Sequence, residues 1–132
     1  MTKFQVTFAA LVVVQAAHSV EEYYGHLYEV FPPARFASGL ISRDLRLGFI
    51  IFNVPPVAFG AWCRLWPVRR RTRSLLVVTW FWIVIELING VGHPLWSVWE
   101  MRYTPGLVTA PILLVLAIAL ARQSRDGERV AA

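Results

Sequence analysis

The sequence predicts an all-α fold, a four-helix transmembrane bundle whose second helix is kinked at a Pro-Pro pair. Hydrophobic residues make up 57% of the chain and charged residues only 16%, so the apolar share exceeds that of a typical soluble domain. Four apolar runs alternate with short polar stretches. The chain also carries six Trp, eight Phe and four Tyr, residues that gather at membrane interfaces. These observations indicate one integral membrane domain.

The first apolar run covers residues 4–22 and is long enough to cross a bilayer. Lys3 before it and the small residues Ala16 and Ala17 within it would also suit a cleavable signal peptide. Polar residues inside this run, and three further apolar runs after it, favour a retained helix. Residues 23–45 are aromatic and interrupted by Gly and Pro, which predicts an interfacial loop or a short surface helix.

The second span is expected over residues 47–66, where Asn53 is followed by Pro55 and Pro56. Proline lacks a backbone donor, so we expect a kink or local unwinding there. The third span is expected over residues 74–93, followed by a Trp-rich turn at 95–103. The fourth is expected over residues 104–121. The membrane domain would then be residues 1–122, and residues 123–132 would form a short polar cytoplasmic tail.

Basic residues are divided unevenly between the two sides of such a bundle. One side, with both termini, would hold nine and the other four: Lys3, Arg64, Arg69, Arg70, Arg71, Arg73, Arg122, Arg125 and Arg129, against Arg35, Arg43, Arg46 and Arg102. The positive-inside rule therefore places both termini in the cytoplasm of a multi-pass protein of the cell membrane. Arginines beside apolar runs indicate topological anchors, so we expect no nucleic-acid partner. Cys63 is the only cysteine and has no partner for an internal disulfide.

Ionisable residues inside two of the spans are the candidates for function, because charge at bilayer depth is costly. His18, Glu21 and Glu22 are spaced to share one helix face, and Gln15 lies one turn earlier.

The third span carries Glu86, Asn89 and His93 with the same kind of spacing. In an up-down bundle both groups lie near the non-cytoplasmic end. The fourth span would begin at that end, at residues 103–106.

Imidazole nitrogens and carboxylate oxygens suit zinc or iron. We therefore expect His18, Glu22, Glu86 and His93 as ligands of a divalent transition metal. The alternative is a neutral hydrogen-bonded cluster that locks the helices together without a metal. Neither an HExxH motif nor a full pair of ExxH motifs is present.

The residues His18-Ser-Val-Glu21-Glu22, a later histidine after Asn89, and Tyr103-Thr-Pro105-Gly106 together resemble the HXXEE-domain family of small membrane proteins. The resemblance covers nearly the whole chain and implies that these motif positions belong to the site, but it implies no reaction. Combining it with the spacing, we expect catalytic and supporting roles for the following residues: Glu21, Glu22, Glu86 and Tyr103 as catalytic, and Gln15, Asn89, Pro105 and Gly106 as supporting.

Two classes of function fit these residues. The first is a metal-dependent enzyme that acts within the membrane on a lipid or other apolar substrate. The second is a small transporter or an ion- or proton-handling protein, which with four helices would require a homo-oligomer. A structural membrane subunit is a third possibility. The nearly apolar cytoplasmic halves of the first and fourth spans favour a one-sided cavity over a channel.

Overall fold

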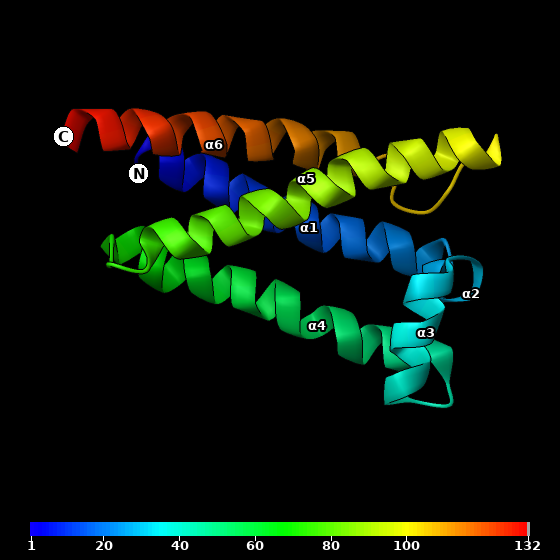
Figure 1. The fold of residues 1–132 in the computed structure, drawn as a ribbon. Helices are drawn as coiled ribbons and strands as arrows, with labels where there is room; N and C mark the ends of the chain where they lie inside the picture. Colours follow the sequence, from blue (N-terminus) through cyan, green and yellow to red (C-terminus); the bar gives the residue numbers. More distant parts are fainter. Residues whose placement is uncertain (132) are drawn as a thin grey trace.

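The computed structural model describes the backbone of residues 1–131 and the side chains of residues 1–125. Every element in this part of the chain is helical (Figure 1). In chain order these are α1 (Lys3–Tyr24), α2 (Leu27–Val30), α3 (Pro32–Ile41), α4 (Leu45–Cys63), the π-helical turn η1 (Arg64–Val68), α5 (Leu75–Glu100) and α6 (Ala110–Ala131). The expected all-α class is confirmed. Within the expected tail, the side chains of residues 126–132 lie outside the described part.

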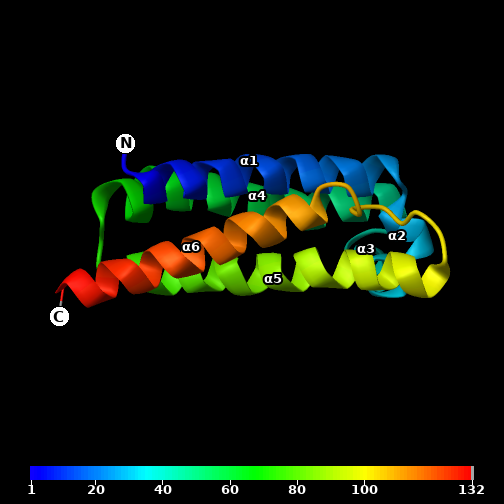
Figure 2. The ribbon, with the colours of Figure 1, turned by 90° about the horizontal axis from the view of Figure 1, so that it is seen from above.

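The four long helices run along one axis in alternating directions, so both termini lie at the same end of the bundle (Figure 1). The short helices α2 and α3 lie at the opposite end, beside the loop that joins α5 to α6. Seen from above, α6 crosses the bundle in contact with both α1 and α5 (Figure 2). Helix α4 packs on α1 and α3 but is separated from α5 along much of its length. This separation leaves room for the cavity described below.

Local sequence signals account for several helix ends. Thr2 and Gln5 form a capping box at the start of α1, which satisfies two backbone donors that the helix leaves free. Asp44 caps α4 by accepting from the backbone N–H groups of Arg46 and Leu47. Helix α3 begins at Pro32, a position where the missing N–H costs nothing.

The interior near the two termini is filled by apolar side chains from α1, α5 and α6. Phe8, Leu11, Ile83 and Leu120 are fully buried there, and Trp82 is 1% exposed. Fully burying a side chain of this size stabilises a fold by about 1.5–3 kcal/mol. These side chains form the apolar core of this half of the bundle.

Three helices are long and apolar enough to cross a membrane: Lys3–Tyr24, Leu45–Val68 and Leu75–Glu100, the second including η1. Within the described residues, α6 is not among them. Its apolar part, residues 110–121, contains twelve residues, about 18 Å at 1.5 Å per residue. A span needs about 20 residues, so the fourth crossing stays a prediction.

The structure corrects two expected helix boundaries. Helix α5 does not end at His93 but continues through Pro94 to Glu100, so the expected Trp-rich turn is its last part. Trp96 packs there on Phe31, with ring centroids 4.7 Å apart, which holds the extension against α2 and α3. Helix α6 begins at Ala110 rather than at Thr104, because residues 105–109 form turns.

Helix α4 continues through Pro55 and Pro56 to Cys63, and irregular helix occurs only later, at η1 around Pro67. Local unwinding at the proline pair is therefore not seen, and the kink stays a prediction. Asn53 bonds locally, its Nδ2 donating to the carbonyl of Phe49 at 3.1 Å. This bond does not replace the two that the prolines lack, because Pro55 and Pro56 leave the carbonyls of Ile51 and Phe52 without their usual donors.

Candidate functional site

The candidate site is centred on one carboxylate between two imidazoles from different helices. Glu22 and His18 lie one turn apart on α1, and His93 lies on α5. Oxygen Oε1 of Glu22 is 3.3 Å from His18 Nε2 and 3.2 Å from His93 Nε2. The two rings meet edge to face, with centroids 4.7 Å apart. All three residues are buried, and their potential ligand atoms lie within 4.8 Å of one another.

Nε2 of each ring faces the Glu22 carboxylate. The hydrogen bond made by Nδ1 of the same ring determines whether a neutral imidazole carries its proton on Nδ1 or on Nε2. Nδ1 of His93 lies 2.7 Å from the carbonyl oxygen of Pro105. A carbonyl only accepts, so Nδ1 carries the proton and Nε2 of a neutral His93 presents a lone pair.

His18 has the same tautomer for a less direct reason. Its Nδ1 lies 2.7 Å from the hydroxyl oxygen of Thr109, and that hydroxyl donates its own proton to Glu21 Oε2 at 2.6 Å. Thr109 must therefore accept from His18 Nδ1, which leaves the lone pair on Nε2. Both imidazoles thus direct Nε2 lone pairs at Glu22.

Glu21 organises the loop that supplies these partners. One of its oxygens accepts from the Tyr103 hydroxyl at 2.7 Å and the Val108 N–H at 3.0 Å. The other accepts from the N–H and the hydroxyl of Thr109. Glu21 thus ties residues 103–109 to α1 and reaches the His pair only through Thr109. Outside the spans, the pKa of Tyr103 is raised to about 12 by partial burial, by this hydrogen bond and by the charge of Glu21.

Three buried acceptors converge at the centre of the site. The His18 side chain is 1% exposed and the Glu22 side chain 10%, and in the described part of the chain His18 Nε2 has no hydrogen-bond partner. A carboxylate facing two lone pairs in an apolar setting requires a proton or another cation among them. These three residues could hold a metal ion: metal-binding histidines commonly use one ring nitrogen as ligand while the other donates to an outer oxygen.

The Pro105-Gly106 turn lies against both imidazoles. This close approach requires that residue 106 has no side chain. Gly106 has a φ of +91°, and a Cβ at this position would lie 2.5 Å from His93 Nδ1 and 2.7 Å from His18 Cε1. Gly25 makes room for the same turn, because its Cβ would lie 2.6 Å from the Pro105 ring. These two glycines let the loop close over the site.

Glu86 is fully buried but belongs to a neighbouring cluster rather than to the ligand group. Asn89 Nδ2 donates to its Oε2 at 3.2 Å. With the side-chain amide of Gln15 oriented to suit both groups, its nitrogen lies 3.1 Å from each oxygen of Glu86. Three of the four expected ligands therefore converge, and Glu86 is held apart from them by two amides.

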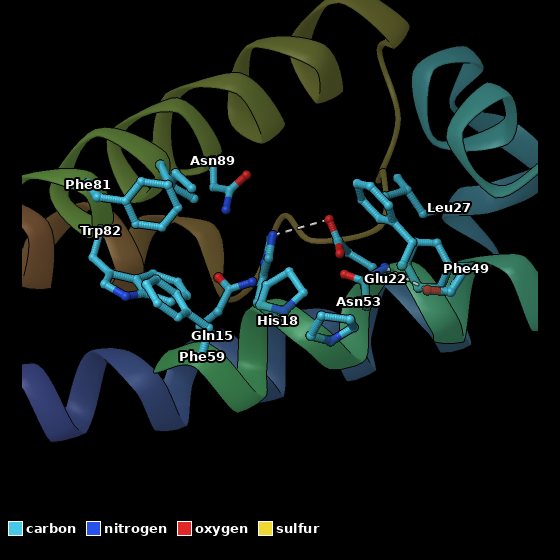
Figure 3. A pocket seen from close by; sticks show the side chains of 14 residues that line it. Gln15, His18, Glu22, Leu27, Phe49, Asn53, Phe59, Phe81, Trp82 and Asn89 are labelled. Carbon is cyan, nitrogen blue, oxygen red and sulfur yellow. Dashed lines mark hydrogen bonds and ion pairs between the residues drawn. The ribbon is translucent and has the colours of Figure 1, made fainter. Parts of the chain in front are cut away.

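A cavity of about 510 Å³ adjoins the site between α1, α4 and α5 (Figure 3). Its polar wall includes His18, Glu22 and the amides of Gln15, Asn53 and Asn89. Apolar side chains form the remaining wall: Leu27, Phe49, Phe52, Pro55, Pro56, Phe59, Phe81, Trp82 and Ile85. The volume lies within the range of about 300–1,000 Å³ that is usual for small-molecule sites.

Comparison with known proteins agrees with these motif positions. A family model described as "Protein of unknown function with HXXEE motif" matches residues 9–121. The chain belongs to the HXXEE family. No curated protein and no solved structure matches the chain, so the family assignment brings no reaction with it.

Within the HXXEE motif, the structure distinguishes two roles that the sequence spacing does not: facing the cavity and binding the loop. His18 and Glu22 face the cavity, whereas Glu21 faces the loop. Sequence reasoning missed Thr109, which connects Glu21 to His18. The available signal was a hydroxyl residue, one of two with Thr104, near the start of the otherwise apolar run at 104–121.

Proposed function

We propose that this chain is a four-span membrane protein with an intramembrane metal site that acts on a lipid or other apolar substrate. Three apolar helices, their alternating directions and the shared position of the termini support a multi-pass arrangement. The fourth crossing would combine the turns at 105–109 with α6. The excess of basic residues at the terminal end of the bundle supports cytoplasmic termini. A kink at Pro55-Pro56 remains part of this proposal.

The convergence of His18 Nε2, His93 Nε2 and the Glu22 carboxylate is the observation that carries the functional proposal. Two imidazoles and one carboxylate are a common set of zinc ligands, and they also suit iron. These three residues would hold the metal. When bound, it would supply a Lewis acid beside the cavity.

The other expected site residues take supporting roles in this proposal. Glu22, besides holding the metal, lies on the cavity wall, where its carboxylate could also take part in proton transfer. Glu21 and Tyr103 position His18 through Thr109. Glu86 holds Gln15 and Asn89 at the polar wall.

The apolar core near the termini favours a one-sided site over the alternative of ion or proton transport. A path across the bundle would have to pass Phe8, Leu11, Ile83 and Leu120, all fully buried apolar side chains. Polar groups are usual along ion paths in membranes; these four side chains offer none, although Thr79 is buried nearby on α5. The cavity therefore suits binding and reaction better than conduction.

Metal analysis of the purified protein in detergent tests the site. We expect about one zinc or iron ion per chain, the stoichiometry of a mononuclear site. The variants His18→Ala, Glu22→Gln and His93→Ala should lose it. His26→Ala is the matched control, because the His26 side chain is 58% exposed and lies outside the ligand group. Wild type with as little metal as the three site variants would support the neutral cluster instead.

Lipid analysis tests the reaction. Cells that produce wild type should differ in at least one lipid species from cells that produce His18→Ala at the same level. His26→Ala should reproduce the wild-type profile. Identical profiles in all three strains, with metal present in wild type, would contradict a lipid enzyme while leaving the metal site intact.

A further inference from the structure

The two ends of the cavity differ in chemistry. Near α2 and α3 it is bordered by Glu22 together with Leu27 and Phe49, and towards the middle of the bundle it ends at Phe59 and Trp82 (Figure 3). Between the two ends it is lined by His18, Gln15 and Asn89. A ligand that satisfies both ends has one polar group and one long apolar part. This is the chemistry of a single-chain amphiphile or of one chain of a membrane lipid.

The end of the bundle nearest the polar wall is closed to water-borne ligands by packed side chains. Leu27 and Tyr28 of α2 are buried together with Phe49 of α4, and Trp96 packs against this cluster. On the loop side, Gly106 lies against both imidazoles. A ligand from water would have to displace this covering.

The side of the bundle is open instead. Helices α4 and α5 are held together by aromatic contacts at one place, where Phe59 lies 5.7 Å from Phe81 and 6.2 Å from Trp82 between ring centroids. From these contacts towards the α2 and α3 end, the cavity opens between the two helices. Phe52 and Phe81 border it and are 50% and 47% exposed. In a bilayer this opening faces hydrocarbon.

The length of the cavity matches the chains of one lipid leaflet. Phe49 and Phe59 line its two ends and lie ten residues apart on α4, about 15 Å at 1.5 Å per residue. One leaflet contributes half of a hydrocarbon core of about 30 Å, which is also about 15 Å. The Glu22 carboxylate lies towards the interface end and the aromatic side chains of Phe59 and Trp82 towards the middle, the same direction as a lipid in that leaflet.

From this geometry we infer that the substrate is a membrane lipid from the leaflet at the α2 and α3 end. It enters sideways between α4 and α5. One hydrocarbon chain of the lipid lies in the cavity with its end at Phe59 and Trp82. The polar group that joins this chain to the rest of the lipid lies beside His18 and Glu22. This inference rests on the proposed function, since it names the substrate class of the same site.

Photo-crosslinking of the full chain in phosphatidylcholine vesicles tests the inference. Two phosphatidylcholine probes are used, one with a diazirine near the end of an acyl chain and one with a diazirine next to the ester. We expect the chain-end probe to label peptides that contain Phe59 or Trp82. The ester-side probe should label peptides that contain Leu27 or Phe49.

A cavity-filling variant and a matched control connect the labelling to the cavity. Ile85 lines the cavity, whereas the adjacent Val84 does not and is 50% exposed. Ile85→Trp should lower cavity labelling by about tenfold, the change that 1.4 kcal/mol of lost binding produces. Val84→Trp should leave it unchanged. The positions labelled in the wild-type protein already test the inference, so the test remains even if one variant folds poorly.

The outcomes also separate this inference from the proposed function. Labelling of outward helix faces only, equal for both probes, would overturn the inference even if the metal is present. Lipid labelling retained in a wild type that lacks metal would support the lipid cavity and contradict the metal enzyme.

Discussion

Replacing Thr109 by valine should weaken metal binding without removing any ligand. The substitution preserves the shape of the side chain but deletes the hydroxyl that accepts from His18 Nδ1 and donates to Glu21. His18 would then have no acceptor for its Nδ1 proton and could turn over to the other tautomer. Loss of an outer partner of a metal-bound histidine typically costs 10–100-fold in affinity, about 1.4–2.7 kcal/mol.

A competition titration with a chromogenic chelator on detergent-solubilised protein measures this affinity. Thr109→Ser is the matched control, because it keeps the hydroxyl and loses only a methyl group. Glu21 would keep its bonds from Tyr103 and from the Val108 and Thr109 N–H groups in both variants, so the loop should stay in place. Equal zinc affinity for wild type, Thr109→Ser and Thr109→Val would refute the argument that Thr109 sets the tautomer of His18.

Two further predictions concern the loop over the site. Gly106→Ala should destabilise the fold by roughly 2–6 kcal/mol, since a positive φ and a Cβ 2.5 Å from His93 Nδ1 both carry a cost. Thermal unfolding would show it as a lower Tm. Gly92→Ala, whose Cβ would meet no atom within 4 Å, should be neutral or slightly stabilising in its helix, and equal Tm values for the two variants would contradict the close packing. For Tyr103, a pKa of about 12 in the folded protein against about 10 in the unfolded chain means that folding favours the neutral phenol. The difference in the free energy of unfolding between wild type and Tyr103→Phe should therefore be largest below pH 10 and decrease between pH 10 and 12. Chemical denaturation across this range measures it, and a difference that does not change with pH would count against the Tyr103–Glu21 bond.

Helical periodicity made part of the site predictable. The spacing of His18 and Glu22 brings them together on any helix, and the alternating order of the long helices brings His93 to the same end. The first inference depends only on local helix geometry, and the second only on a simple up-down topology. Both therefore survive in the structure, where the three side chains share a common centre.

The limits of periodicity appear at Glu86 and at Thr109. Glu86 has the spacing of a ligand, but Gln15 and Asn89 hold its carboxylate away from the His pair. Thr109 has no such spacing, yet its hydroxyl contacts His18 because the preceding turns fold back over the site. Distances between helices differ by several ångströms with small changes in packing, and sequence spacing carries no information about them.

The sequence by itself determined the helical class, the number of apolar runs and the spacing that places His18 and Glu22 on one face of α1. Hydrophobicity and the 3.6-residue period are properties of each segment alone. Only the tertiary structure decided that α4 lies apart from α5 and leaves a cavity, and that one glutamate of the motif contacts both imidazoles while its neighbour holds a loop. These outcomes depend on how side chains from distant segments fill a common space, because close packing permits few arrangements of the same helices.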